Sequence, residues 1–119
     1  MKKRFRVKRN EEFQQIIQEG VKTVTRSFIA YRRKATMLTN DRVGISISKK
    51  LGNAVERNKI KRQVRTMVAE ATDFRSGFDT VIIVRNRYNE RSYQENKKEL
   101  LKIYETVYNN DVDQPNEGV

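Results

Sequence analysis

The spacing of hydrophobic residues predicts a helix, two strands, a second helix, a third strand and a final helix. The first helix follows a basic arm over residues 1–9, and its apolar residues Phe13 and Ile17 lie one turn apart. Asn10 is expected to cap this helix and Gly20 to end it. Because the helix is short, it needs to dock on the rest of the fold to persist.

Alternating polarity predicts strands over residues 21–34 and 42–48, separated by a turn at residues 36–41. The short link between them predicts an antiparallel hairpin. On the second strand, large apolar residues alternate with small ones, among them Gly44 and Ser46. The small face leaves room for another group to approach the sheet.

The second half of the chain predicts a helix over about residues 55 to 71, a strand at 81–84 and a last helix from Ser92. The strand is an uninterrupted β-branched run, which is typical of a strand covered on both faces. Ser92 and Glu95 form a capping box at the start of the last helix. Residues 109–119 are polar and acidic, and we expect them to be disordered.

This order of elements predicts a single-domain α+β fold, a two-layer sandwich in which three helices pack with a small mixed sheet in the order αββαβα. The domain is expected to span residues 1–108, because the chain of 119 residues can bury one hydrophobic core but not two. The strand over 42–48, the helix after it and the strand at 81–84 form a split βαβ crossover. The general rule favours a right-handed crossover.

The charge of the chain is strongly positive and unevenly distributed. Lys and Arg total 26 against 15 Asp and Glu, which gives a net charge of +11. Residues 1–34 carry 11 basic and 3 acidic side chains, residues 35–75 carry 9 and 4, and residues 76–119 carry 6 and 8. We therefore expect the first two-thirds of the chain to face a polyanion.

Several classes of chemistry are excluded by residues that the chain lacks. It has no Cys and no His, so disulfides, Cys/His zinc sites, thiol catalysis and imidazole bases are excluded. Its carboxylates form no two-metal pattern, and it has no Walker-type loop, so we expect no catalytic residue in this chain. The longest aliphatic run covers only residues 81–84, and the basic residues 1–10 precede no apolar stretch. We therefore expect a cytoplasmic protein with no membrane partner.

The segment from Lys49 to Arg65 carries seven basic residues and one acidic residue. At about 100° per residue, one arc of roughly 100° on its helix is apolar. That arc holds Ile60, Val64, Met67, Val68 and Ala71. The adjoining arc of about 200° is almost wholly cationic. It holds Arg57, Asn58, Lys59, Lys61, Arg62 and Arg65, and Lys49 and Lys50 precede the helix.

A charged helix face is most often just solvated surface. Here the face lacks interleaved acids that would relieve its repulsion, and it is rich in Arg, whose planar fork suits phosphates. Asn58 can donate to a phosphate or a 2′-hydroxyl. These features favour a nucleic-acid interface.

A second group of residues combines aromatic and apolar side chains near a basic run. It comprises Phe13, Ile17, Phe28 and Tyr31. Exposed aromatics beside basic residues on a sheet provide a stacking platform for single-stranded RNA. Each of the phenylalanines could equally be a core residue, whereas a tyrosine tolerates a half-exposed position.

The stretch from Gly44 to Arg65, GISISKKLGNAVERNKIKRQVR, resembles the family of bacterial ribonuclease P protein components. The family motif, of the form R-N-x-x-K-R after S-K-K-x-G-N-A-V, stands here at residues 57–62. The resemblance also covers N-E-E-F at residues 10–13, R-S-F-x-x-Y at residues 26–31 and V-I-I-V before Arg85.

This resemblance implies a left-handed crossover, against the general rule. It also implies a protein that binds the catalytic ribonuclease P RNA subunit and the 5′ leader of precursor tRNA, with Mg²⁺ held mainly by the RNA. The holoenzyme would remove the leader endonucleolytically. The residues expected to contact the RNA subunit are Lys49, Lys50, Arg57, Asn58, Lys59, Lys61, Arg62 and Arg65. Those expected to line the leader-binding cleft are Phe13, Ile17 and Tyr31.

Two other functions share part of this pattern. A structural protein of the ribosomal type would carry the same charge and fold class. A DNA-binding module would also be basic, but the basic helix follows a loop and a strand rather than a helix and a tight turn, so DNA is not an expected partner.

Overall fold

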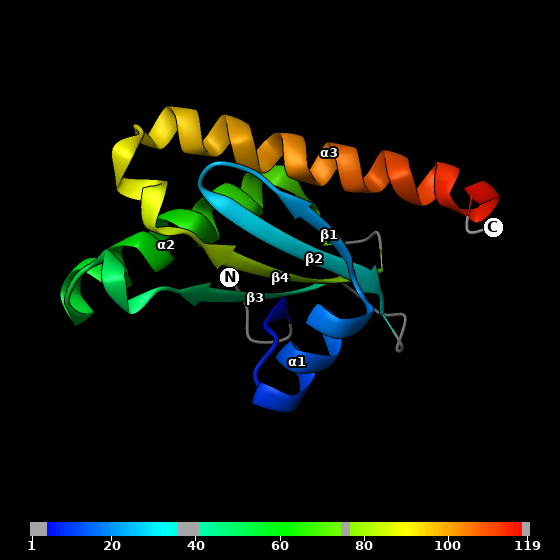
Figure 1. The fold of residues 1–119 in the computed structure, drawn as a ribbon, viewed down its shortest axis with the longest axis horizontal. Helices are drawn as coiled ribbons and strands as arrows, with labels where there is room; N and C mark the ends of the chain where they lie inside the picture. The colour runs from blue at the N-terminus through cyan, green and yellow to red at the C-terminus, as the bar shows by residue number, and fades with distance from the viewer. Residues whose placement is uncertain (1–4, 36–40, 75–76, 118–119) are drawn as a thin grey trace.

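The computed structural model describes residues 5–35, 41–74 and 77–117, with side chains as far as Glu105. This part of the chain forms a mixed α+β fold, as the sequence predicted (Figure 1). The elements are α1 (Asn10–Glu19), β1 (Val21–Val24), β2 (Phe28–Lys34), β3 (Arg42–Ile47), the 3₁₀ turn η2 (Lys49–Leu51), α2 (Ala54–Ala71), β4 (Phe78–Val84), the 3₁₀ turn η3 (Asn86–Glu90) and α3 (Tyr93–Glu117).

The four strands form one sheet in the order β1-β2-β4-β3. β2 pairs antiparallel with both β1 and β4, whereas β3 runs parallel to β4. Helices α2 and α3 lie over one face of the sheet, and α1 lies against the other, so that β4 is covered on both sides (Figure 1). The predicted burial of this strand is confirmed, and the strand is longer than predicted because Phe78, Asp79 and Thr80 extend it.

Two strand predictions were wrong. Residues 21–34 form two strands, because Thr25 closes a turn in which its amide and hydroxyl donate to the carbonyl of Phe28 at 2.8 and 3.2 Å. β2 and β3 are not a hairpin either, because β4 lies between them. Most of the turn predicted between these strands, residues 36–40, lies outside the described residues.

The main core lies between the sheet and the helices α2 and α3. The predicted apolar stripe of α2 is confirmed, since Ile60, Val64, Met67 and Val68 are all buried in this core. The start of α3 is also confirmed as a capping box. The amide of Ser92 donates to a Glu95 carboxylate oxygen at 3.0 Å, and the Glu95 amide donates to the Ser92 hydroxyl at 3.1 Å.

The two ends of α1 lie where the sequence predicted, but the residues there act differently. The helix includes Asn10, and the extended residue before it, Arg9, provides no side-chain cap. Gly20 ends the helix as predicted, but with an ordinary negative φ of −78°. A Cβ at Gly20 would lie 2.6 Å from the carbonyl oxygen of Ile16 and 2.8 Å from the amide nitrogen of Arg32. Glycine is needed here because the backbones approach so closely.

Helix α3 continues to Glu117, so a helical backbone extends into the segment for which the sequence predicted disorder. The division into a domain over residues 1–108 and a disordered tail stays a prediction, as does the hand of the crossover. Within the described residues, no helix is both long enough and apolar enough to cross a bilayer.

Candidate nucleic-acid interface

The start of α2 is fixed by a capping box that the sequence analysis did not single out. The Asn53 side chain accepts from the Glu56 amide at 2.9 Å, and the Glu56 carboxylate accepts from the Asn53 amide at 2.9 Å. Gly52 precedes the cap with φ of 133°, and a Cβ there would lie 2.5 Å from Glu56 Oε1. The only acidic residue in the basic segment thus serves the helix start.

The turn before the cap presents two lysines. The Ser48 hydroxyl accepts from the amide of Lys50 at 3.2 Å, and Leu51 is buried in the main core. Lys49 and Lys50 are both exposed. Ser48 therefore has a local structural role in holding this turn.

We define the cationic helix surface as the predicted polar residues of α2 together with these two lysines. It comprises Lys49, Lys50, Arg57, Asn58, Lys59, Lys61, Arg62 and Arg65. Within the described residues, none of its basic side chains forms an ion pair with an acidic one. Val55, which is 76% exposed, adds an apolar side chain to this surface that sequence reasoning missed.

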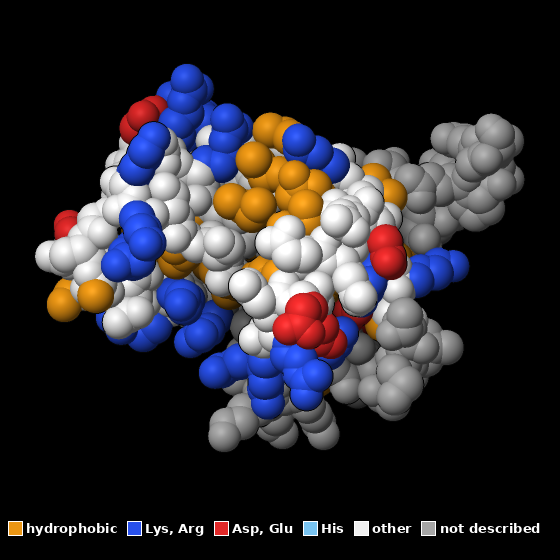
Figure 2. Space-filling view, turned by 60° about the horizontal axis from the view of Figure 1, so that its bottom comes forward, with side chains coloured by type: hydrophobic (Ala, Val, Ile, Leu, Met, Phe, Trp, Pro, Cys, Tyr) orange, Lys and Arg blue, Asp and Glu red, His pale blue; other side chains and the backbone are white. Residues whose placement is uncertain are grey.

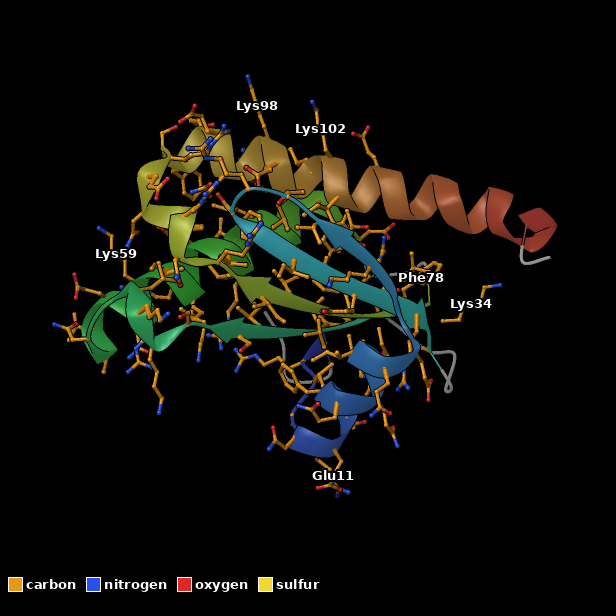
Figure 3. All side chains as sticks on the ribbon, viewed as in Figure 1. Glu11, Lys34, Lys59, Phe78, Lys98 and Lys102 are labelled. Atoms are coloured by element: carbon orange, nitrogen blue, oxygen red, sulfur yellow. The ribbon has the colours of Figure 1, made fainter. Side chains whose placement is uncertain are left out.

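The basic residues of α2 do not all lie on one side. Arg57, Lys61 and Arg65 follow one another at intervals of four residues and are half-buried, and the Nε of Arg57 donates to the Gly52 carbonyl at 3.2 Å. Lys59 lies about 160° from Lys61 around the helix. It projects on the side of η3, where Gln63, one turn on, accepts from the Tyr88 hydroxyl (Figure 3). Lys59 therefore lies apart from Arg57, Lys61 and Arg65.

The N-terminal arm adds a further cation to the surface. Arg6 forms a parallel bridge with Val43, and the amide of Val7 donates to the Val43 carbonyl at 3.0 Å. Burial and then the positive charge of Arg6 lower the pKa of the Arg65 guanidinium, so the two arginines are neighbours. The sequence indicated only a basic arm, because the position of Arg6 depends on pairing with β3.

A second surface lies on the sheet face that carries α1. Phe13, Ile17 and Tyr31, together with Ile83, are partly buried and pack on a small core. That core comprises Val7, Ile16 and Val81. We call these four partly buried residues the apolar sheet patch. Figure 2 shows hydrophobic side chains gathered in one exposed group, with lysine and arginine side chains around it.

Phe28, which the sequence analysis grouped with these residues, belongs to the opposite face. It is fully buried in the main core and meets the ring of Tyr88 edge-to-face at 5.8 Å. Phe28 and Tyr31 lie three positions apart along β2, so they point to opposite faces. Phe28 is therefore a core residue.

Gly44 on β3 accommodates Phe13. A Cβ at Gly44 would lie 2.5 Å from Cζ of the Phe13 ring, so the ring rests directly on the strand backbone. The space predicted beside the small residues of β3 is thus filled here by α1, whereas Ser46 farther along the strand is exposed. β3 also links the two surfaces, since it leads directly into the turn that holds Lys49 and Lys50.

A cluster of ion pairs around the buried Asp79 holds α1 over the sheet. Asp79 is fully buried and accepts from Arg42 at 3.1 Å and from Arg33 at 3.3 Å. The same two arginines reach α1, where Arg42 pairs with Glu12 at 2.8 Å and Arg33 with Glu19 at 2.9 Å. The hydrogen bond from Arg42 lowers the pKa of Glu12. No sequence motif revealed this cluster, because its members come from four separate elements.

The fold and these two surfaces define a small basic α+β protein with an interface suited to a polyanion. The family model described as Ribonuclease P matches residues 1–108. The chain is 45% identical over 105 residues to the ribonuclease P protein component of Bacillus cereus strain AH187, covering 87% of this chain and 91% of that protein. The corresponding protein of Bacillus anthracis strain CDC 684 is 44% identical over 105 residues, covering 87% of this chain and 88% of that protein.

Solved structures agree with this likeness. The ribonuclease P protein of Staphylococcus aureus matches with a TM-score of 0.73 and 34% identity, covering 87% of this chain and 96% of that one. The ribonuclease P protein of Thermotoga maritima matches with a TM-score of 0.73 and 28% identity, covering 86% and 96%. The chain therefore belongs to the ribonuclease P protein family. Membership makes it a subunit of an endoribonuclease holoenzyme that has an RNA partner.

Proposed function

We propose that this chain binds the catalytic RNA of ribonuclease P through the cationic helix surface and the 5′ leader of precursor tRNA through the apolar sheet patch. In this role it assists the Mg²⁺-dependent removal of the leader in the cytoplasm. The observation that carries the proposal is a helix whose basic side chains have no acidic partner in the described part of the chain, beside a partly exposed patch of aromatic and aliphatic side chains.

The two surfaces suit different parts of an RNA. Unpaired lysines and arginines neutralise phosphates without reading sequence, which suits a structured RNA subunit. Partly exposed rings and aliphatic side chains contact the faces of unstacked bases, which only a single strand offers. A precursor differs from a mature tRNA by its single-stranded leader, so the patch would favour substrate over product.

We assign the chemical step to the RNA subunit and its bound Mg²⁺. Three carboxylates near the interface support this assignment, because each is committed to another contact. Asp79 and Glu12 are paired with arginines, and Glu56 caps α2. Among the described residues, no group of three or more acidic residues, histidines or cysteines could hold a metal ion.

The contribution of the protein is then electrostatic and positional. Two RNAs that approach each other repel, and basic side chains between them reduce the Mg²⁺ concentration needed for assembly. If the cationic helix surface makes about five phosphate contacts, the logarithm of the affinity for the RNA should fall with the logarithm of salt concentration with a slope near −4 to −5.

The proposal is tested by a cleavage assay at low Mg²⁺ with 5′-labelled precursor tRNA and a bacterial ribonuclease P RNA, with and without the protein. We expect cleavage at the mature 5′ end only when both components are present. Cleavage by the protein alone would contradict the assignment of catalysis to the RNA. RNA binding without any effect on cleavage would contradict the proposed role and favour a structural protein of the ribosomal type.

A further inference from the structure

Lys22 on the edge strand β1 lies directly opposite Tyr31 in the pairing of β1 with β2. Its ammonium nitrogen lies over the Tyr31 ring, 5.9 Å from the ring centroid. Lys22 is exposed, whereas Tyr31 is half-buried in the apolar sheet patch. The pairing register therefore sets a cation beside the aromatic residue of the patch, and the ring helps to hold that cation in place.

Lys22 differs from the other basic residues on the strands of this face. Arg33 and Arg42 are committed to Asp79 and to acidic residues of α1. Lys22 has no acidic partner in the described part of the chain. Its charge is therefore available to a phosphate from outside the protein.

The position of Lys22 also fits a strand of nucleic acid that leaves the patch over the edge of the sheet. The register places Lys22, Tyr31, Val81 and Gly44 in one row across β1, β2, β4 and β3. Three strand spacings separate the ends of this row, or roughly 14 Å. Lys22 thus lies at the end of the row that is farthest from β3 and the cationic turn that follows it.

The neighbouring row on the same face carries no charged side chain and is partly exposed. It consists of Val24, Ile29, Ile83 and Ser46, of which Val24 is 54% exposed. Such side chains contact base faces but offer no charge to a backbone phosphate. Lys22 supplies that charge at this end of the patch.

We propose that Lys22 and Tyr31 form one nucleotide-binding unit, in which the Tyr31 ring contacts a leader base and the Lys22 ammonium contacts an adjoining leader phosphate. This inference rests on the proposed function of the patch and extends it to β1. It predicts that the leader extends beyond Tyr31 to the edge strand β1 rather than ending at Tyr31.

The test uses the full chain assembled with a ribonuclease P RNA and measures the Kd of precursor tRNA with a short or a long leader. We expect Lys22→Gln to weaken binding of the long-leader precursor about fivefold, because one phosphate contact is lost. The short-leader precursor should bind unchanged, and Lys22→Arg should bind like the natural chain. The matched control is Lys98→Gln, which removes an equal charge from the outer side of α3 (Figure 3).

A neutral methylphosphonate, placed at one leader position at a time, identifies the phosphate. We expect one position at which it weakens binding to the natural chain but not to the Lys22→Gln variant. Equal binding by the Lys22 and Lys98 variants would overturn the inference, as would a Lys22→Gln loss that is the same for both leader lengths. If the natural chain itself does not discriminate leader length, the proposed function of the patch fails instead.

Discussion

The ring of Phe13 rests on the backbone of Gly44, so closely that a Cβ at Gly44 would lie 2.5 Å from the ring Cζ. This contact joins α1 to β3 and fixes the height of Phe13 above the sheet. The apolar sheet patch therefore requires a residue without a side chain at position 44.

Gly44→Ala should destabilise the fold and weaken leader binding together. The added methyl group overlaps the Phe13 ring, and overpacking of this kind costs about 1–3 kcal/mol. Urea unfolding measures the stability, and the Kd of a long-leader precursor measures the patch. Ser46→Ala is the matched control, since Ser46 is exposed on the same face of β3 and should change stability by less than about 0.5 kcal/mol. A Gly44→Ala variant with unchanged stability would contradict the close seating of the ring.

Arg62→Ala and Tyr31→Ala should separate the two proposed binding roles. Arg62 is exposed on the cationic helix surface, so its loss should weaken binding of the RNA subunit and flatten the salt dependence. Loss of the Tyr31 ring should reduce the preference for precursor over mature tRNA by about 1–3 kcal/mol. Tyr31→Phe should retain most of that preference, because the ring face remains. Equal loss of both properties in both alanine variants would contradict the division.

The sequence predicted those features that depend on neighbours along the chain. The apolar stripe of α2 follows from positions such as Ile60 and Val64, which recur within one helical turn. The capping box of Ser92 and Glu95 spans only three residues. The apolar stripe of α2 and the start of α3 can therefore be predicted from local periodicity and spacing alone.

Features that depend on strand pairing could not be predicted in this way. In the sheet, β4 lies between β2 and β3, although it is far from β2 in the sequence. The short link between β2 and β3 instead favoured a hairpin. Lys22 and Arg6 reach the interface through their pairing with β2 and β3, respectively. The burial of Asp79 among arginines likewise requires β2, β3 and β4 to be assembled.

The contact between Glu12 and Arg42 should make the docking of α1 sensitive to acid. The hydrogen bond from Arg42 lowers the folded-state pKa of Glu12 below its ordinary value of 4.5. A lowered carboxyl pKa contributes stability that is present above the unfolded pKa and is lost as the pH falls through the folded pKa. The stability difference between the natural chain and Glu12→Gln should therefore shrink below about pH 4.

Urea unfolding between pH 3 and pH 7 measures this difference. Glu11→Gln is the matched control, since Glu11 shares the first turn of α1 and its favourable helix-end position but is exposed. The Glu11 variant should show a smaller difference at pH 7. A Glu12→Gln effect that does not vary with pH would contradict the ion pair as its cause.

Two asparagines near the start of α2 should have opposite effects on folding and binding. Asn53 caps the helix, so Asn53→Ala should cost about 0.5–2 kcal/mol of stability and lower the melting temperature. Asn58 is exposed one turn later and has no capping role, so Asn58→Ala should leave the melting temperature unchanged and weaken binding of the RNA subunit. Thermal unfolding and RNA titration of both variants measure the two properties. If Asn58→Ala lowered the melting temperature and left RNA binding intact, Asn58 would be a structural residue and would leave the cationic helix surface.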